Sequence, residues 1–263
     1  MEWLFNLANL MLRMIAYNVG QGGRRDPTLW SRALQMLAPD LLFVQESRNP
    51  ADSWLAALPG TTEESWLWQA ASRYWGTGLW VRDGRLTPLP VPGAYSGRVV
   101  AAVVEGVGWP MIGLSPVVAI SIHAPTAKGS SYIKEVGHIL DYAKDIAGGL
   151  PLVLGGDFNV AVALRQPNHP LYNSPGERAL LLRLQEEMGL APCWQAAHPN
   201  ETPARTLRWM RRLDSLPYHC DGIFVPAGWI PALHSCDVLE DEHWCALSDH
   251  NPVVASFVPT FSD

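Results

Sequence analysis

Short apolar runs alternate with apolar residues at helical spacing along most of this chain. Four runs have the composition of buried strands, and they lie at Arg13–Asn18, Asp40–Gln45, Val117–Ile122 and Leu152–Leu154. Apolar residues three and four positions apart predict two helices, one between Asp26 and Pro39 and one from Ser130 to Ala147. This strand–helix–strand order predicts an α/β fold.

The remaining predicted elements are shorter. Further strands are expected at Gly78–Arg82, Val99–Glu105, Asp221–Val225 and Pro252–Phe257. Further helices are expected near Asp52–Leu58 and at Glu177–Met188, and residues 189–217 look irregular. With no internal repeat or linker, residues 14–263 are predicted to form one domain, preceded by an N-terminal extension at 1–13. That extension is too short to span a bilayer and is poor as a signal peptide.

Composition narrows the class of protein. Hydrophobic residues make up 48% and charged residues 17%, so a sizeable core is expected. Lys and Arg number 19 against 25 Asp and Glu, and the net charge of -6 argues against nucleic-acid binding by bulk electrostatics. The four cysteines form no C-x-x-C pair, which favours a reduced, cytoplasmic protein, with a monomer as the default oligomeric state.

Polar residues stand at the ends of the predicted strands. Asn18, Glu46, His123 and Asp157 each follow an apolar strand, whereas Asp221 and His250 stand at or just before the start of one. If the last two strands run antiparallel to the first four, all of these side chains meet at one edge of the sheet system. Their residue types are those of metal-assisted phosphoryl chemistry.

The stretch from Gly155 to Asn159 has two interpretations. The two glycines allow a tight turn at the strand end, and alternation along an extended chain would point Asp157 and Asn159 the same way. A carboxylate beside an amide oxygen suits a hard cation and a phosphate. An ordinary Asx turn explains the same residues without any function.

Chemistry assigns each polar residue a candidate role. Glu46 is the expected anchor ligand of Mg²⁺ or Mn²⁺, with Asn18 and Asp249 as supporting ligands. Asp157 would hold or deprotonate the attacking water, and Asn159 would bind a phosphate oxygen. His250 would act as general base or phosphate ligand with Asp221 as its orienting carboxylate. His123 would protonate a leaving group or stabilise the transition state.

Four segments carry a family resemblance: Leu-Phe-Val-Gln-Glu46, Gly155-Gly-Asp-Phe-Asn159, His219-Cys-Asp-Gly-Ile-Phe-Val225 and Leu247-Ser-Asp-His250. In this order they resemble the endonuclease/exonuclease/phosphatase superfamily of divalent-metal phosphoesterases. The resemblance implies a four-layer α/β sandwich, with two mixed β-sheets packed face to face and helices outside. It also implies Glu46 and Asn18 as metal ligands, with Asp249 as the acid before the catalytic histidine.

The resemblance extends to the remaining catalytic positions. It implies Asp157 and Asn159 as the water- and phosphate-binding pair, and Asp221 with His250 as an Asp–His dyad. His123 is similar to a histidine of the deoxyribonuclease branch, where it is paired with an acid from an earlier loop. Ser72-Arg73-Tyr74 occupies the corresponding region here and contains no acid, and residues 124–127 depart from the abasic-site endonuclease pattern.

Arginines near the predicted site bear on the substrate. Candidate substrate-binding residues are Arg24, Arg25, Arg205, Arg208 and Trp209. Arginine with an interleaved aromatic suits phosphate contact with base stacking, although a solvated loop explains the same residues. The leading hypothesis is a Mg²⁺- or Mn²⁺-dependent phosphodiesterase acting on nucleic acid, an endonuclease-like enzyme. The alternatives are hydrolysis of a small or lipid phosphoester and a catalytically silent binding domain.

Zinc binding is a minor alternative. His234-Ser-Cys236 and His243-Trp-Cys245 repeat a His-x-Cys pattern. Zinc uses both residue types as ligands, but this spacing matches no common zinc finger.

Overall fold

The computed structural model of the chain describes residues 11–20, 27–52, 55–110, 116–126, 128–165, 173–209 and 217–258. Its framework is a pair of six-stranded mixed sheets. The first sheet has the order β11 (Leu233–Val238), β12 (Val253–Phe257), β1 (Leu12–Asn18), β2 (Leu41–Ser47), β4 (Gly76–Val81) and β3 (Trp66–Ala70). The second has the order β5 (Arg85–Pro88), β6 (Val99–Glu105), β7 (Val117–His123), β8 (Leu152–Asp157), β10 (Asp221–Pro226) and β9 (Leu190–Pro192).

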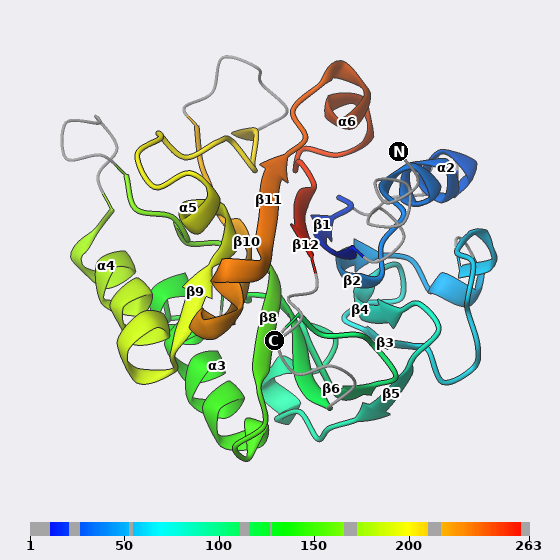
Figure 1. Cartoon of the computed structure of the whole chain (residues 1–263), viewed down its shortest axis with the longest axis horizontal. Helices are drawn as coiled ribbons and strands as arrows, with labels where there is room; N and C mark the ends of the chain where they lie inside the picture. The colour runs from blue at the N-terminus through cyan, green and yellow to red at the C-terminus, as the bar shows by residue number, and fades with distance from the viewer. Residues whose placement is uncertain are drawn as a thin grey trace.

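Helices cover the outer faces of both sheets (Figure 1). The α-helices are α2 (Pro27–Leu37), α3 (Tyr132–Ala147), α4 (Pro175–Leu182), α5 (Cys193–Ala197) and α6 (Glu242–Leu247). A π-helical segment, η4 (Arg183–Glu187), continues α4, and short 3₁₀ turns lie at Pro50–Asp52, Leu55–Ala57, Gly93–Tyr95 and Ala227–Ala232. No helix in the described ranges is long and apolar enough to cross a bilayer.

Three apolar clusters correspond to the three boundaries between four layers. The central cluster lies between the sheets and includes Phe43 and Ile223. A second cluster packs α3 and α4 against the outer face of the second sheet, around Ile139. A third cluster packs α2 against the outer face of the first sheet, around Leu34 and Trp80. The four-layer α/β sandwich expected from the sequence is therefore confirmed.

The two glycines of β8 stand where neighbouring groups leave no space for a side chain. Both lie inside the strand, so the turn expected at this point is wrong. A Cβ atom at Gly155 would lie 2.5 Å from the ring of Phe43, which faces it from the other sheet. Gly156 has a φ of 137°, and a Cβ atom there would lie 2.1 Å from the carbonyl oxygen of Ile122. Side chains larger than hydrogen do not fit at either position.

Helices α3 and α4 begin at side-chain caps. The Ser131 hydroxyl accepts a hydrogen bond from the Lys134 amide at the start of α3. Ser174 and Glu177 form a reciprocal capping box at the start of α4. The helix predicted for Ser130–Ala147 is confirmed, whereas the one predicted for Glu177–Met188 begins earlier and changes to π-helical geometry at Arg183.

Several elements were missed or misplaced. Strands β3, β5, β9 and β11 and helices α5 and α6 were not predicted, and residues 190–197 are ordered as strand and helix rather than irregular. All four of these strands lie at sheet edges, where one neighbouring strand stabilises them and a weak sequence pattern suffices. Strand β1 begins at Leu12, so the end of the predicted N-terminal extension belongs to the sheet.

Candidate active site

The strand directions bring the predicted polar residues to one edge. Strands β7 and β8 are parallel, with His123 opposite Asp157, while β10 is antiparallel to β8, with Asp221 opposite Asp157. Strands β1 and β2 are parallel, and β12 is antiparallel to β1. The predicted antiparallel arrangement of the last two strands is therefore confirmed. Asp157 lies at the centre of this edge, between His123 on β7 and Asp221 on β10.

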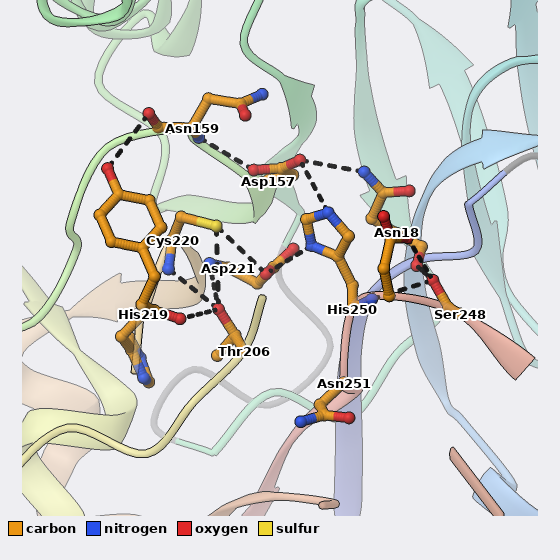
Figure 2. A network of polar contacts seen from close by, with 12 residues as sticks. Asn18, Asp157, Asn159, Thr206, His219, Cys220, Asp221, Ser248, His250 and Asn251 are labelled. Atoms are coloured by element: carbon orange, nitrogen blue, oxygen red, sulfur yellow. Dashed lines mark hydrogen bonds and ion pairs between the residues drawn. The ribbon is translucent and has the colours of Figure 1, made fainter. Parts of the chain in front are cut away.

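Both oxygens of Asp157 are held by hydrogen bonds (Figure 2). Asn18 Nδ2 donates to Oδ2 at 2.9 Å, and the backbone N–H of Asn159 donates to Oδ1 at 2.9 Å. Nε2 of His250 lies 3.8 Å and Nε2 of His123 lies 4.0 Å from Oδ2. Asp157 is only 1% exposed, so its orientation is determined by these neighbours rather than by solvent.

His250 and Asp221 form a buried pair. His250 Nδ1 donates to Asp221 Oδ2 at 2.9 Å, which leaves Nε2 directed toward Asp157 (Figure 2). Burial disfavours the charged imidazole, but the carboxylates of Asp221 and Asp157 outweigh it and raise the pKa of His250 to about 10. In the absence of other ligands His250 is therefore a cation at neutral pH, suited to donating a hydrogen bond from Nε2.

Asn159 is placed by a turn and not by strand alternation. Strand β8 ends at Asp157, and Asn159 has a φ of 53°. The bond from its backbone N–H to Asp157 is the Asx turn that the sequence left as an alternative. Its side-chain Nδ2 donates to the carbonyl oxygen of Ala124 at 3.1 Å. The turn and the functional interpretation are therefore compatible, because the turn itself positions the amide beside the carboxylate.

Glu46 lies at an irregular point of β2. Its φ is 51°, and the pairing of β2 with β4 changes register between Val44 and Ser47. A non-glycine residue in this conformation is strained, and such strain is common at functional sites. The bulge turns the Glu46 carboxylate toward His123, whose Nε2 lies 3.6 Å from Oε1.

The oxygen donors near Glu46 fit a hard divalent cation. Burial raises the pKa of Glu46, and the nearby Asp157 and Asp249 carboxylates act in the same direction, against the opposing effects of His250 and Asn18. Asn18 Oδ1 accepts a bond from the Gly20 N–H and faces the same region. A divalent cation would offset the negative charge gathered there, and carboxylate and amide oxygens are its preferred ligands.

A second group of metal-ligating atoms is explained by internal hydrogen bonds. Single ligand atoms of Asp157, Cys220, Asp221 and His250 all lie within 4.8 Å of one another. Cys220 Sγ donates to Asp221 Oδ2 at 3.6 Å, and burial raises the pKa of this thiol. With the His250–Asp221 bond also present, these groups act as donors and acceptors for each other.

His123 lies between an arginine and two carboxylates, a partner set that the sequence did not predict. Arg98 Nη1 lies 3.2 Å from Nδ1 of His123, and the Arg98 guanidinium stacks on Trp75 at 4.4 Å. The acids near this histidine are Glu46, from β2, and Asp157, from β8. Burial lowers the pKa of His123 to about 4, with Asp157 opposing and Arg98 reinforcing that shift. The ring is therefore neutral, which does not favour the predicted proton donation to a leaving group.

The predicted substrate-binding residues are dispersed. Arg24 and Arg25 lie outside the described residues. Arg208 is only 1% exposed, and its guanidinium donates to the Ser248 carbonyl and to Asn251 Oδ1, so it holds the loop that carries His250. The Arg205 amide donates to Glu240. Trp209 is 58% exposed and lies beside Tyr218 with ring centroids 6.2 Å apart.

Several residues that hold the candidate site residues in position were not predicted from the sequence. Thr206 Oγ1 accepts from the backbone amides of both Cys220 and Asp221, and Leu207 forms bridges with Tyr218 and His250. Residues 205–208 therefore connect the start of β10 to the loop before β12. Figure 2 shows the bonds of Thr206 to Cys220 and Asp221. Arg98 was also missed, although it directly precedes the predicted strand at 99–105, the same signal that identified Asp221.

The zinc alternative finds no support in the described residues. Cys236 is buried in the central core, and within the described ranges neither His-x-Cys segment belongs to a cluster of possible metal ligands. All four cysteines are free thiols.

Comparisons with known proteins agree with the fold. The fold resembles an AP endonuclease from Leishmania major, with 18% identity, a TM-score of 0.69, and coverage of 96% of this chain and 89% of that one. It also resembles a 3'-5' exonuclease from Neisseria meningitidis, with 23% identity, a TM-score of 0.63, and coverage of 94% and 100%. An AP endonuclease from Archaeoglobus fulgidus matches at 18% identity and a TM-score of 0.65 over 94% of this chain and 99% of that chain. The endonuclease/exonuclease/phosphatase family model matches residues 15–250, and the chain therefore belongs to that family.

Proposed function

We propose that this protein is a Mg²⁺- or Mn²⁺-dependent phosphodiesterase that cleaves nucleic acid by attack of water on phosphorus. One observation carries the proposal: Asp157 is held at both oxygens and faces His250, which is itself oriented by Asp221. This combination supplies a fixed carboxylate for a water and an oriented donor for a phosphate oxygen.

Asp157 would orient the attacking water and accept its proton. The bonds from Asn18 and Asn159 restrict the carboxylate to one orientation, so little reorganisation is needed at the moment of attack. Of the two roles predicted for His250, that of phosphate ligand is the better supported, because its pKa of about 10 makes it a donor at neutral pH. Its Nε2 would donate to a non-bridging phosphate oxygen.

Glu46, Asn18 and Asp249 are the residues that would hold the cation. When bound, a divalent ion neutralises charge on the phosphoryl oxygens and draws the phosphate to this edge of the sheets. The proximity of the Asp157 and Asp249 carboxylates to Glu46 supports this assignment, because a bound cation would offset their combined negative charge.

Nucleic acid is the favoured substrate. Trp209 exposes 58% of its surface, and its neighbour Tyr218 has the Arg165 guanidinium 5.4 Å from its ring and its hydroxyl 3.5 Å from the Asn159 carbonyl. An exposed aromatic and an arginine next to the phosphate-binding residues suit a stacked base and its phosphate. Arg24 and Arg25 are proposed as further phosphate contacts.

A small or lipid phosphoester is the second candidate, favoured by the net charge of -6. For either substrate we place the protein in the cytoplasm, because four free cysteines are typical of a reducing compartment.

A metal-dependent substrate panel tests the proposal. Plasmid DNA, RNA, an inositol phosphate and sphingomyelin would be incubated with Mg²⁺, with Mn²⁺ and with excess chelator. We expect cleavage of nucleic acid only with metal, and a loss of roughly 1,000-fold in Asp157→Ala. Asp145→Ala, an exposed acid on α3, is the matched control and should retain full activity.

Three results would contradict this function. Full activity in chelator, or in Asp157→Ala, would exclude the mechanism. Turnover of only the inositol phosphate or sphingomyelin would establish the second candidate. No hydrolysis of any substrate, together with no Mn²⁺ binding in calorimetry, would indicate a silent binding domain.

A further inference from the structure

A buried glutamine connects the two sheets directly beneath the candidate site. Gln45 lies on β2 of the first sheet, one residue before Glu46, and is 0% exposed. Its Nε2 donates a hydrogen bond to the Ser121 hydroxyl at 3.0 Å. Ser121 is also 0% exposed and lies on β7 of the second sheet. The bond is therefore a polar contact between the sheets, within a layer that is mainly apolar.

Strand β8 encloses the same amide. Phe43 precedes Gln45 by two residues on the same face of β2, and its ring lies against Gly155. At the next position of β8, a Cβ atom on Gly156 would lie 2.8 Å from Gln45 Nε2. The β8 backbone thus lies against the amide, and a side chain at position 156 would displace it.

The residues that follow this bond belong to the candidate site. Glu46 follows Gln45 on β2, and His123 follows Ser121 by two residues on β7. The 3.6 Å from Glu46 Oε1 to His123 Nε2 is a distance between the two sheets. A hydrogen bond between the sheets at the preceding residues restrains that distance.

A glutamine at this position is costly for stability. Gln45 Oε1 and Thr77 Oγ1 both lie between the sheets, and neither has a hydrogen-bond partner within the described ranges. An amide or hydroxyl oxygen that is buried and unpaired costs free energy, which an apolar side chain of similar size would avoid. Departures of this kind from the most stable core are expected at functional sites.

We propose that Gln45 is a positioning residue, which through its bond to β7 sets the placement of Glu46 relative to His123. Glu46 has a φ of 51°, and a residue keeps such a conformation only where its surroundings hold it. A site divided between two sheets has to be held to within about 0.5 Å, and hydrogen bonds behind the reacting groups supply that precision. The consequence for catalysis rests on the proposed function, whereas the effect on geometry does not.

Crystal structures of the metal-free full chain test the geometry directly. Gln45→Met keeps the length of the side chain but removes the amide, and Ser121→Ala removes the acceptor from the other sheet. In either variant the distance from Glu46 Oε1 to His123 Nε2 should differ from that in the wild type by at least about 0.5 Å. Ser121→Ala also serves if Gln45→Met does not fold. The same distance in the wild type and the variants would overturn the proposal.

Stability and metal binding separate a positioning role from a purely structural one. The double variant of Gln45→Met and Ser121→Ala removes donor and acceptor together, so its midpoint of urea unfolding should stay close to that of the wild type. Its dissociation constant for Mn²⁺, measured by calorimetry, should nevertheless rise about 10-fold or more. A purely structural role predicts a lower midpoint with unchanged Mn²⁺ affinity, and that result would overturn the proposal.

Two control variants calibrate these measurements. Gln185→Met replaces an exposed glutamine of η4 and should change neither stability nor Mn²⁺ affinity. Val117→Ala creates a cavity at the far end of β7, where Val117 is 0% exposed. It should lower the unfolding midpoint without weakening Mn²⁺ binding, because it leaves the bond beneath the site intact.

Steady-state kinetics tests the consequence for catalysis. Gln45→Met and Ser121→Ala should each lower kcat by roughly 10-fold, and the double variant should lose little more than either alone because both remove the same bond. Ser121→Thr keeps a hydroxyl and should retain most of the activity. Multiplicative losses would show that the two residues act separately and would overturn the proposal. If the wild type binds no Mn²⁺ or cleaves no phosphoester, the proposed function fails, while the crystal structures still decide whether Gln45 sets the geometry.

Discussion

Nδ1 of His250 donates a hydrogen bond to Oδ2 of Asp221 across 2.9 Å, and the two residues are next to or within strands of different sheets. His250 precedes β12 in the first sheet, and Asp221 begins β10 in the second. Asp221 is also the ladder partner of Asp157. The geometry of the proposed catalytic residues therefore depends on how the two sheets are aligned, and residues 205–208 hold that alignment with hydrogen bonds to both sides.

Replacement of Asp221 by an amide should disrupt catalysis while the protein stays folded. Asp221→Asn keeps the size of the side chain but loses the charge that orients His250, and we expect kcat to fall by roughly 100-fold with a smaller change in KM. Steady-state kinetics measures both constants. Asp237→Asn, an exposed acid on β11, is the control, and equal losses in the two variants would contradict a specific role for Asp221.

The charge on His250 should make stability depend on pH. Its pKa is raised from 6.5 to about 10 in the folded protein, so the stabilising contribution is complete below 6.5 and is lost as the pH rises toward 10. Urea unfolding in chelator would compare the wild type with His250→Gln across this window. The stability advantage of the wild type should shrink as the pH increases, and a constant difference would show that His250 is not protonated in the folded state.

Glu46→Gln should affect metal response and stability in opposite directions. The variant loses a charged ligand, so at least about tenfold more Mg²⁺ should be needed for half-maximal activity. Because the folded-state pKa of Glu46 is raised, its ionised form destabilises the metal-free fold at neutral pH, and the variant should unfold at a higher temperature without metal. Metal titrations and thermal unfolding measure the two effects. Glu105→Gln, at the far end of β6, should change neither.

A variant of Arg208 can distinguish a structural role of this residue from a substrate-binding role. Removal of its buried hydrogen bonds to Ser248 and Asn251 in Arg208→Met should cost about 1–3 kcal/mol of unfolding free energy and lower kcat more than it raises KM. Chemical denaturation and steady-state kinetics measure the two. An increase in KM with unchanged stability would instead indicate direct contact with substrate. Arg85→Met is the exposed control.

The close approach of the sheets at β8 should be sensitive to a single methyl group. Gly155→Ala places a Cβ atom 2.5 Å from the Phe43 ring, and we expect a loss of about 1–3 kcal/mol in unfolding free energy. Urea unfolding measures the change. Gly228→Ala meets nothing within 4 Å and should be nearly neutral, so equal effects would contradict the packing explanation.

The sequence alone determined the fold class and most residues of the candidate site. Long apolar strands and a strongly periodic helix are local patterns, and they predicted β7 and α3 nearly to the residue. A polar residue at the end of a buried strand is also a local signal. This signal identifies six residues of the candidate site from the sequence alone: Asn18, Glu46, His123, Asp157, Asp221 and His250.

Only the tertiary structure decided which of these residues face each other. Arg208 and Arg98 have the same side chain, yet Arg208 is buried beneath the His250 loop and Arg98 lies against His123. Likewise, position 155 of β8 requires glycine, because Phe43 of the other sheet occupies the space that a side chain would need. These outcomes depend on contacts between segments far apart in the chain, and local periodicity contains no information about such contacts.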